Sequence, residues 1–160
     1  MVPRRISGIT EHGFSVAELV TVIAILGILA AIAIPNFLSY LQAAQTKGAA
    51  QEVAALLNQA RQLAITQNQS VCADPSGSLM RFRLGSCAGT TWKGPGTDSA
   101  GNITLSNNAV FTATAQITFS SLGGASPAAR LSVRNQANTS TMDIVINPTG
   151  RVRTTCAGCP

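Results

Sequence analysis

Histidine is nearly absent from this sequence: the single one, His12, precedes the first long apolar run. The chain beyond it therefore has no imidazole, which excludes a Ser-His-Asp or Cys-His catalytic arrangement and an imidazole metal site there. Asp74, Asp98 and Asp143 lie on separate segments, without the pairing that general acid–base catalysis needs. A Gly-Lys-Ser/Thr phosphate-binding motif is also missing. We therefore expect neither an enzyme nor a cofactor.

Charge is scarce as well. Charged residues make up 11% of the 160 residues, against 46% for hydrophobic ones, and the length suits one ordinary domain with an appendage. The apolar residues gather in residues 14–38, and the rest is rich in Ser, Thr, Asn and Gly. The net charge is +5; without residues 1–13, which hold Arg4, Arg5 and Glu11, nine basic and five acidic residues remain, or about +4. Such a field favours anionic partners, nucleic acid or lipid headgroups, without identifying one.

The N-terminal segment predicts a membrane anchor. Arg4 and Arg5 precede a polar tract that ends at Gly13, and the apolar run that follows reaches Ile34. That run is about as long as a bilayer requires, and the arginines favour a leader that stays in the cytoplasm. A signal anchor that is never cut fits the same pattern. Glu18 argues for more, because a carboxylate inside an apolar segment is costly and is by default a functional hypothesis.

These residues resemble the type IV pilin and pseudopilin superfamily. Its precursors carry a short basic leader that ends in Gly and is cut before Phe, with Glu at the fifth mature position, as at Gly13, Phe14 and Glu18. Gly27 and Pro35 match a Gly and a Pro farther along the family's helix. The resemblance implies cleavage after Gly13 by a prepilin peptidase and methylation of the new Phe14 amine. It also implies a single-pass subunit of the bacterial inner membrane that is later built into a pilus or pseudopilus.

Glu18 has a physical role available in such a filament. The ammonium group of a processed Phe14 and the Glu18 carboxylate each carry a charge that an apolar medium penalises. In a helical stack, one subunit's carboxylate can neutralise its neighbour's amine and fix the axial register. An intramolecular pair is the alternative, because the two residues are four apart. Pro35 lacks an N–H and clashes with the preceding turn, so a kink or local melting between Gly27 and Pro35 on assembly is expected.

Beyond the apolar run, hydrophobic periodicity predicts a longer helix followed by strands. Steps of three and four, typical of an amphipathic helix, relate Ala49, Val53, Leu56, Ala60 and Leu63, with Ala50, Leu57 and Ala64 beside them and Gln51, Asn58 and Gln62 opposite. After Gln69 the period becomes two. Alternation typical of half-buried antiparallel strands marks Met80–Phe82–Leu84, Ile117–Phe119, Leu131–Val133 and Met142–Ile144–Ile146. A loop rich in Gly, Ser and Thr lies between Ser86 and Asn102.

The order of these segments resembles the GspH/FimT branch of the superfamily, which comprises the type II secretion pseudopilin H and minor pilins of type IV pili. The expected fold is α+β, with a long N-terminal helix packed on a small antiparallel β-sandwich or bent sheet. We expect a cleaved cytoplasmic leader at 1–13 and a transmembrane and assembly half of the helix at 14–38. An amphipathic half at 39–69 and a β-rich extracytoplasmic domain at 70–160 follow.

Four cysteines are best interpreted as disulfides, because the mature domain is expected outside the cytoplasm, where disulfides persist. Three connectivities are possible, and we favour Cys72–Cys87 with Cys156–Cys159, since both close short segments. The alternative is half of a four-thiolate zinc site, or a redox motif, at Cys156 and Cys159. A second closely spaced pair and a βαβ pattern are missing for it.

The C-terminal Gly-Arg-x-Arg segment is a candidate DNA site. Residues 147–150, Asn-Pro-Thr-Gly, suit a type I turn. If a strand follows, Arg151 and Arg153 share one face and Val152 faces the core, and paired guanidinium groups suit phosphate oxygens. The same wording resembles a C-terminal motif of FimT-type minor pilins associated with DNA uptake. The alternative, which the sequence alone favours, is a solvated hairpin edge whose arginines keep it soluble or contact a neighbouring subunit.

Lys93 and Arg134 could extend the patch. Trp92, beside Lys93, is typical of a residue that packs beneath its loop rather than one that stacks on a base. The leading hypothesis is a minor pilin or pseudopilin at a filament tip whose partners are other pilin subunits, prepilin peptidase, the inner membrane and, in one version, DNA. The alternative is a purely structural pseudopilin for protein secretion.

Overall fold

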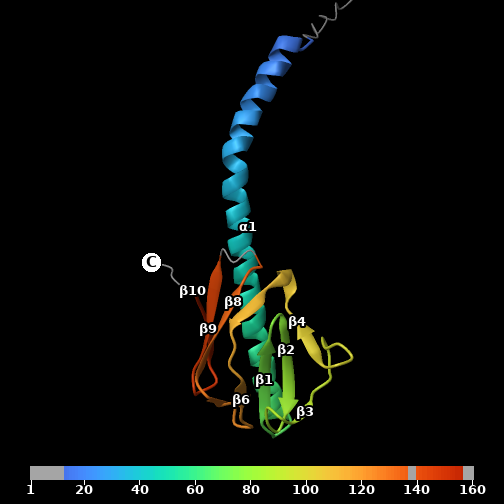
Figure 1. The fold of residues 1–160 in the computed structure, drawn as a ribbon, viewed down its shortest axis with the longest axis vertical. Coiled ribbons are helices and arrows are strands. Elements are labelled where there is room, and N and C mark those ends of the chain that lie inside the picture. The colour runs from blue at the N-terminus through green and yellow to red at the C-terminus, as the bar shows by residue number, and fades with distance from the viewer. Residues whose placement is uncertain (1–12, 137–139, 157–160) are drawn as a thin grey trace, which may run out of the picture. The chain divides into compact units, whose positions relative to one another are not determined.

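A computed structural model describes residues 13–136 and 140–156. One long helix, α1 (Val16–Thr66), precedes all the strands (Figure 1). The chain divides within α1 into two units, one ending at Ser39 and one beginning at Tyr40.

The first unit contains the apolar half of α1. Ser15 immediately precedes the helix, and its carbonyl accepts the N–H groups of Glu18 and Leu19 at 3.0 and 3.1 Å. Every side chain from residue 13 to residue 41 is exposed, including the large apolar ones. By length and composition the helix could cross a membrane. It continues through Pro35, so the expected kink or melting on assembly stays a prediction.

The second half of α1 covers the domain core, as the sequence predicts. Its buried side chains are Thr46, Ala49, Ala50, Val53, Leu57, Ala60 and Ala64. Leu56 and Leu63, expected in the same stripe, are partly buried at its margin. Gln51, Asn58 and Gln62 are exposed. The predicted amphipathic helix is confirmed, and α1 ends at Thr66, three residues before the expected boundary.

Two antiparallel sheets complete the second unit. Sheet A has the order β3-β2-β1-β6-β7. Strand β4 also pairs with β2. Its strands are β1 (Val71–Ser76), β2 (Leu79–Leu84), β3 (Thr90–Thr91), β4 (Asn102–Thr104), β6 (Ile117–Phe119) and β7 (Ala125–Ser126). Sheet B has the order β10-β9-β8-β5. Its strands are β5 (Val110–Ala113), β8 (Ala129–Arg134), β9 (Thr141–Ile146) and β10 (Val152–Cys156). A short 3₁₀ helix, η1 (Ser106–Asn108), precedes β5.

A single hydrophobic cluster joins the helix to both sheets, which confirms the α+β fold. Phe82 and Phe119 from sheet A and Leu131 and Ile144 from sheet B are fully buried in it. At about 25 cal/mol per Å² of buried apolar surface, such side chains each stabilise the fold by roughly 2 kcal/mol. The alternating segments identified in the sequence form β2, β6, β8 and β9.

Strand β1 has no counterpart among the expected strands. Its sequence does not alternate, and it contains Pro75, which cannot donate a ladder hydrogen bond. The structure accommodates this proline because β6 pairs only with residues 71–73 of β1. Pro75 is opposite Met80 of β2 and lies beyond the β6 pairing.

Candidate functional site

The expected processing site lies at the start of the described chain. Gly13 and Phe14 are exposed and precede the first helical residue, and Phe14 is 80% exposed. Glu18 lies in the first helical turn, where a carboxylate interacts favourably with the positive end of the helix dipole. Gly27 and Pro35 are exposed within α1. Because Pro35 has no N–H, it cannot supply the backbone hydrogen bond that an ordinary residue makes in a helix.

A tight turn carries the second candidate site. The N–H of Gly150 donates to the carbonyl of Asn147 at 2.8 Å, and the N–H of Asn147 donates to the carbonyl of Arg151 at 3.0 Å. Gly150 has φ of +75°, in the region that glycine adopts at little cost. The expected turn at residues 147–150 and the strand after it are therefore both present.

The turn is fixed by contacts with α1 and with the β6–β7 turn. The Nε of Arg61 donates to the carbonyl of Gly123 at 2.9 Å. A Cβ on Gly150 would collide with the same Gly123 carbonyl oxygen, so the two turns are in close contact. The N–H of Ala125 also donates to the carbonyl of Pro148 at 2.9 Å. The hairpin that carries the arginines is thus fastened to the domain at its tip.

Arg151 and Arg153 are both exposed, whereas Val152 packs against the core. Alternation in a strand therefore places both guanidinium groups on the outer face of sheet B. The register adds a residue that the sequence argument missed. Arg153 lies opposite Val145 of β9, and Val145 lies opposite Arg130 of β8. Two strand spacings of about 4.8 Å separate the Cα atoms of Arg153 and Arg130.

Asp143 anchors Arg130. The carboxylate is only 8% exposed, and its Oδ2 lies 3.3 Å from Nη1 of Arg130. The hydroxyl of Ser132 donates to its Oδ1 at 2.6 Å. The Arg130 side chain nevertheless stays 68% exposed, so most of its guanidinium donors face solvent. The sequence hint was the alternation of Arg130 with Leu131, but only strand pairing reveals its neighbours.

The other two expected basic residues lie outside this cross-strand row. Arg134 is on the outer face of β8, but it pairs with Thr141. It is four residues, or about 13 Å, along the strand from Arg130. Lys93 is exposed and follows β3. In the strand order of sheet A, β3 and β7 are at opposite ends. The structure thus brings Arg151, Arg153 and Arg130 together and leaves Lys93 apart.

Trp92 packs beneath its loop, as expected. It is half-buried, and its ring centroid lies 5.9 Å from that of Phe82 in a tilted arrangement. Gly94 lies close against the same ring, because a Cβ there would collide with it. Trp92 is therefore committed to the core and is not presented to a base.

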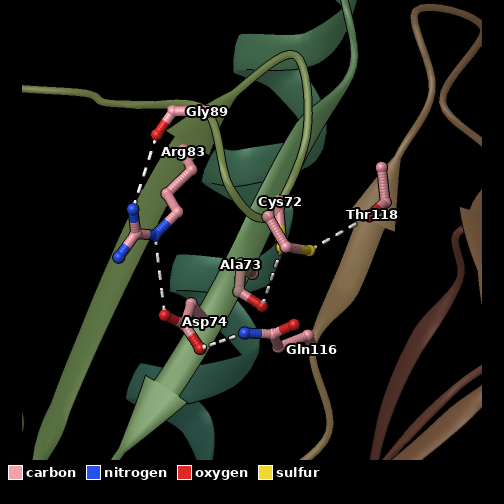
Figure 2. Close-up of a disulfide and its surroundings, with 8 residues drawn as sticks. Cys72, Ala73, Asp74, Arg83, Gly89, Gln116 and Thr118 are labelled. Atoms are coloured by element: carbon pink, nitrogen blue, oxygen red, sulfur yellow. Dashed lines mark hydrogen bonds and ion pairs between the residues drawn. A yellow bond between two sulfur atoms is a disulfide. The ribbon is translucent and has the colours of Figure 1, made fainter.

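One of the two expected disulfides is present, between Cys72 and Cys87. Figure 2 shows its surroundings, in which the Thr118 hydroxyl lies 3.5 Å from the Cys87 sulfur. The neighbouring Asp74 lies 3.7 Å from Nε of Arg83 and accepts a hydrogen bond from Gln116 at 3.0 Å.

Cys156, the other expected bridging residue described, is exposed at the end of β10. Its expected partner, Cys159, lies outside the described residues, so that pairing stays a prediction. Among residues 13–136 and 140–156, no three His, Cys, Asp or Glu side chains are grouped to hold a metal ion.

Comparison with known families shows which family the chain belongs to. Residues 49–150 match the family described as type II transport protein GspH. This chain belongs to the GspH family. The match covers the docked half of α1 and both sheets as far as the Asn147–Gly150 turn. It places the chain in the GspH/FimT-like branch of the pilin and pseudopilin superfamily, as the order of the segments after the apolar run predicts.

Individual relatives agree with this placement. A fimbrial protein of Pseudomonas aeruginosa is 35% identical over 86 residues, which is 54% of this chain and 55% of that protein. The chain thus matches about half the length of this curated relative. The crystal structure of the type IV minor pilin FimU of Pseudomonas aeruginosa is 17% identical and has a TM-score of 0.51. The similarity covers 68% of this chain and 91% of FimU.

The minor pseudopilin EpsH of the Vibrio cholerae type II secretion system is also similar. It is 14% identical, with a TM-score of 0.55, over 74% of this chain and 98% of that one. At these identities the two structures establish the fold of this GspH family member and nothing about its ligands.

Proposed function

We propose that this protein is a minor subunit of a type IV pilus or a type II secretion pseudopilus, positioned toward the filament tip. The carrying observation is the apolar half of α1, whose large side chains are all exposed. A helix that is apolar all round and uncovered needs a bilayer or other helices around it. The inner membrane supplies the first and the filament the second. Membership of the GspH family supports the same role.

Glu18 would set the register of assembly. Prepilin peptidase would cut between Gly13 and Phe14, leaving a new amine that is then methylated. In the filament the Glu18 carboxylate of one subunit would lie near the Phe14 ammonium group of its neighbour. Both groups are at the exposed start of α1, which leaves them accessible to the peptidase and to a second subunit.

The test is filament incorporation in a bacterium with the matching assembly machinery. Wild-type protein should be found both in the inner membrane and in sheared filaments. Glu18→Gln should be processed and inserted normally, but should be depleted from filaments by about tenfold or more, since an unpaired amine in an apolar medium is costly. The same substitution at Glu52, in the docked half of α1, is the matched control. Wild-type incorporation of the Glu18 variant would exclude the proposed pairing.

We further infer a second role, binding of DNA phosphates by Arg151 and Arg153 during DNA uptake. Both guanidinium groups are exposed on one face of a hairpin whose tip is fastened by Arg61 and Gly123. Exposed side chains on a fixed backbone suit phosphate contacts, which position a protein without reading sequence. A purely structural secretion pseudopilin remains the competing function, and it requires no role for these arginines.

The two functions differ in what a double substitution does. The full chain in neutral detergent should bind a DNA duplex near physiological salt. Arg151→Gln with Arg153→Gln should lower the slope of log affinity against log salt by up to about 1.8, or about 0.9 for each phosphate that is no longer neutralised. Filament incorporation should be unchanged while DNA uptake falls. Equal binding by the double variant and the wild type would leave the structural role alone.

A further inference from the structure

The outer face of sheet B carries four arginines and one carboxylate among its described residues. Arg153 comes from the edge strand β10 and Arg151 immediately precedes that strand, Arg130 and Arg134 come from β8, and Asp143 comes from β9 between them. Asp143 is buried beneath the face and is occupied by Arg130 and Ser132. The charge that this face presents to solvent is therefore strongly positive.

We propose that Arg130 is a further phosphate contact and that the ligand of this face is the backbone of double-stranded DNA. The inference rests on the DNA-binding role proposed for Arg151 and Arg153. Arg130 shares a cross-strand row with Arg153, with only Val145 between them. Its guanidinium is anchored at Nη1 and exposed elsewhere, so it can contact an anion without first being ordered.

The spacing allows contacts to both strands of a duplex. About 10 Å between the Cα atoms of Arg130 and Arg153 lies between the roughly 6 Å and 12 Å widths of the minor and major grooves. Arginine side chains in this row can reach phosphates of both strands across a groove. Arg151 and Arg153, about 6.6 Å apart along an extended chain, can follow one strand of the duplex.

The chemistry of the face argues against single-stranded nucleic acid. Binding of single strands relies on aromatic side chains on which bases stack. The outward positions of β8, β9 and β10 contain none, and Trp92 is packed against Phe82 on sheet A. The same outward positions also present no exposed carboxylate or amide that could hydrogen-bond to a base edge, because Asp143 is buried. Binding should therefore depend on charge and duplex shape, with no base-sequence preference.

The experiment measures anisotropy of a labelled 20-bp duplex and of one of its strands, with the full chain in neutral detergent, at roughly 50 to 200 mM salt. Wild-type protein should prefer the duplex. Arg130→Gln should lower the salt slope by about 0.9, whereas Lys47→Gln, which removes an exposed charge from α1, should change it by much less. Arg130→Lys should retain most of the binding because it keeps the charge.

A second variant distinguishes a loss of DNA binding from a loss of folding stability. Arg130→Gln leaves the buried Asp143 carboxylate without its cation, which is destabilising. Adding Asp143→Asn removes that unpaired charge, and this double variant should regain thermal stability while its DNA binding stays weak.

The outcomes distinguish the two proposals. If Arg130→Gln behaves like Lys47→Gln while the Arg151 and Arg153 variant binds weakly, the role of Arg130 is wrong and the DNA function stands. If single strands bind as tightly as duplex, the duplex assignment is wrong. If wild-type protein does not bind, or the Arg151 and Arg153 variant binds normally, the DNA function itself falls.

Discussion

Arg61, near the end of α1, donates its Nε–H to the carbonyl of Gly123 in the β6–β7 turn at 2.9 Å. Gly150 of the β9–β10 turn lies against the same carbonyl. One side chain thus connects the helix to the two turns that fix the tip of the arginine hairpin. The connection fixes the tip of this hairpin relative to the end of α1.

Arg61→Ala should destabilise the domain by about 1.5 kcal/mol, because a hydrogen bond from a charged donor to a carbonyl is removed. Chemical denaturation measures the change. Gln62→Ala, an exposed neighbour on the same helix, should be close to neutral. If Arg61→Ala is also neutral, this hydrogen bond does not fasten the turns.

Gly150→Ala should lower the free energy of unfolding of the domain by more than Arg61→Ala does. Its φ of +75° costs an ordinary residue about 1 to 2 kcal/mol, and the new methyl group would collide with the Gly123 carbonyl. We expect unfolding at lower denaturant and displaced amide resonances at residues 147–153. Gly77→Ala, which also has positive φ but open space around it, controls for the backbone cost alone.

Processing should leave Phe14 as the first residue. Intact-mass measurement of membrane-extracted protein should show loss of residues 1–13 and the addition of one methyl group. Gly13→Leu should block the cut if the peptidase requires the absence of a side chain there. A full-length N-terminus in cells with active peptidase would contradict the assignment.

The pKa of Asp98, measured in a pH titration, should show whether the loop before β4 has the hydrogen bonds seen in the structure. The backbone N–H and the side chain of Asn102 donate to its carboxylate at 2.8 and 3.0 Å, and these bonds lower the pKa of Asp98 below 3.8. A lowered pKa favours the folded state while the group is ionised, so the contribution is present above pH 3.8 and is lost as pH falls through the folded value.

Carboxyl resonances followed by NMR should therefore show Asp98 titrating below its ordinary range. Asn102→Ala should raise that pKa toward the ordinary value, and Ser99→Ala, an exposed loop neighbour, should not. A normal titration of Asp98 in the wild type would show that the loop is not held in this way.

The Cys72–Cys87 disulfide spans 15 residues, and closing such a loop stabilises a protein by about 3 kcal/mol in the chain-entropy model. Replacing both cysteines with Ala should lower the free energy of unfolding by about 2 to 3 kcal/mol. Alanine is preferred to serine because Cys72 is fully buried. Reductant should destabilise the wild-type protein by more than it destabilises the double variant, which keeps only Cys156 and Cys159.

Several features followed from local sequence alone. The apolar run with Glu18 predicted an uncovered helix, and the step from period 3.6 to period 2 located the end of the helix within three residues. Strands such as β2 and β8 alternate clearly, because each has one face in the core and one in solvent. The Asn147–Gly150 turn was predictable because its residues supply the required backbone angles.

The tertiary structure decided what lies beside what. Alternation shows that Arg130 and Arg153 each face outward, but only the β8-β9-β10 register places them in one row. The same pairing separates Arg134 from Arg151, and the strand order leaves Lys93 on another sheet. Strand β1 was hidden because Pro75 breaks the local signal, and it is tolerated only where β6 stops pairing. Side-chain periodicity is a local property of the backbone, whereas register depends on hydrogen bonds between segments distant in sequence, which no local pattern specifies.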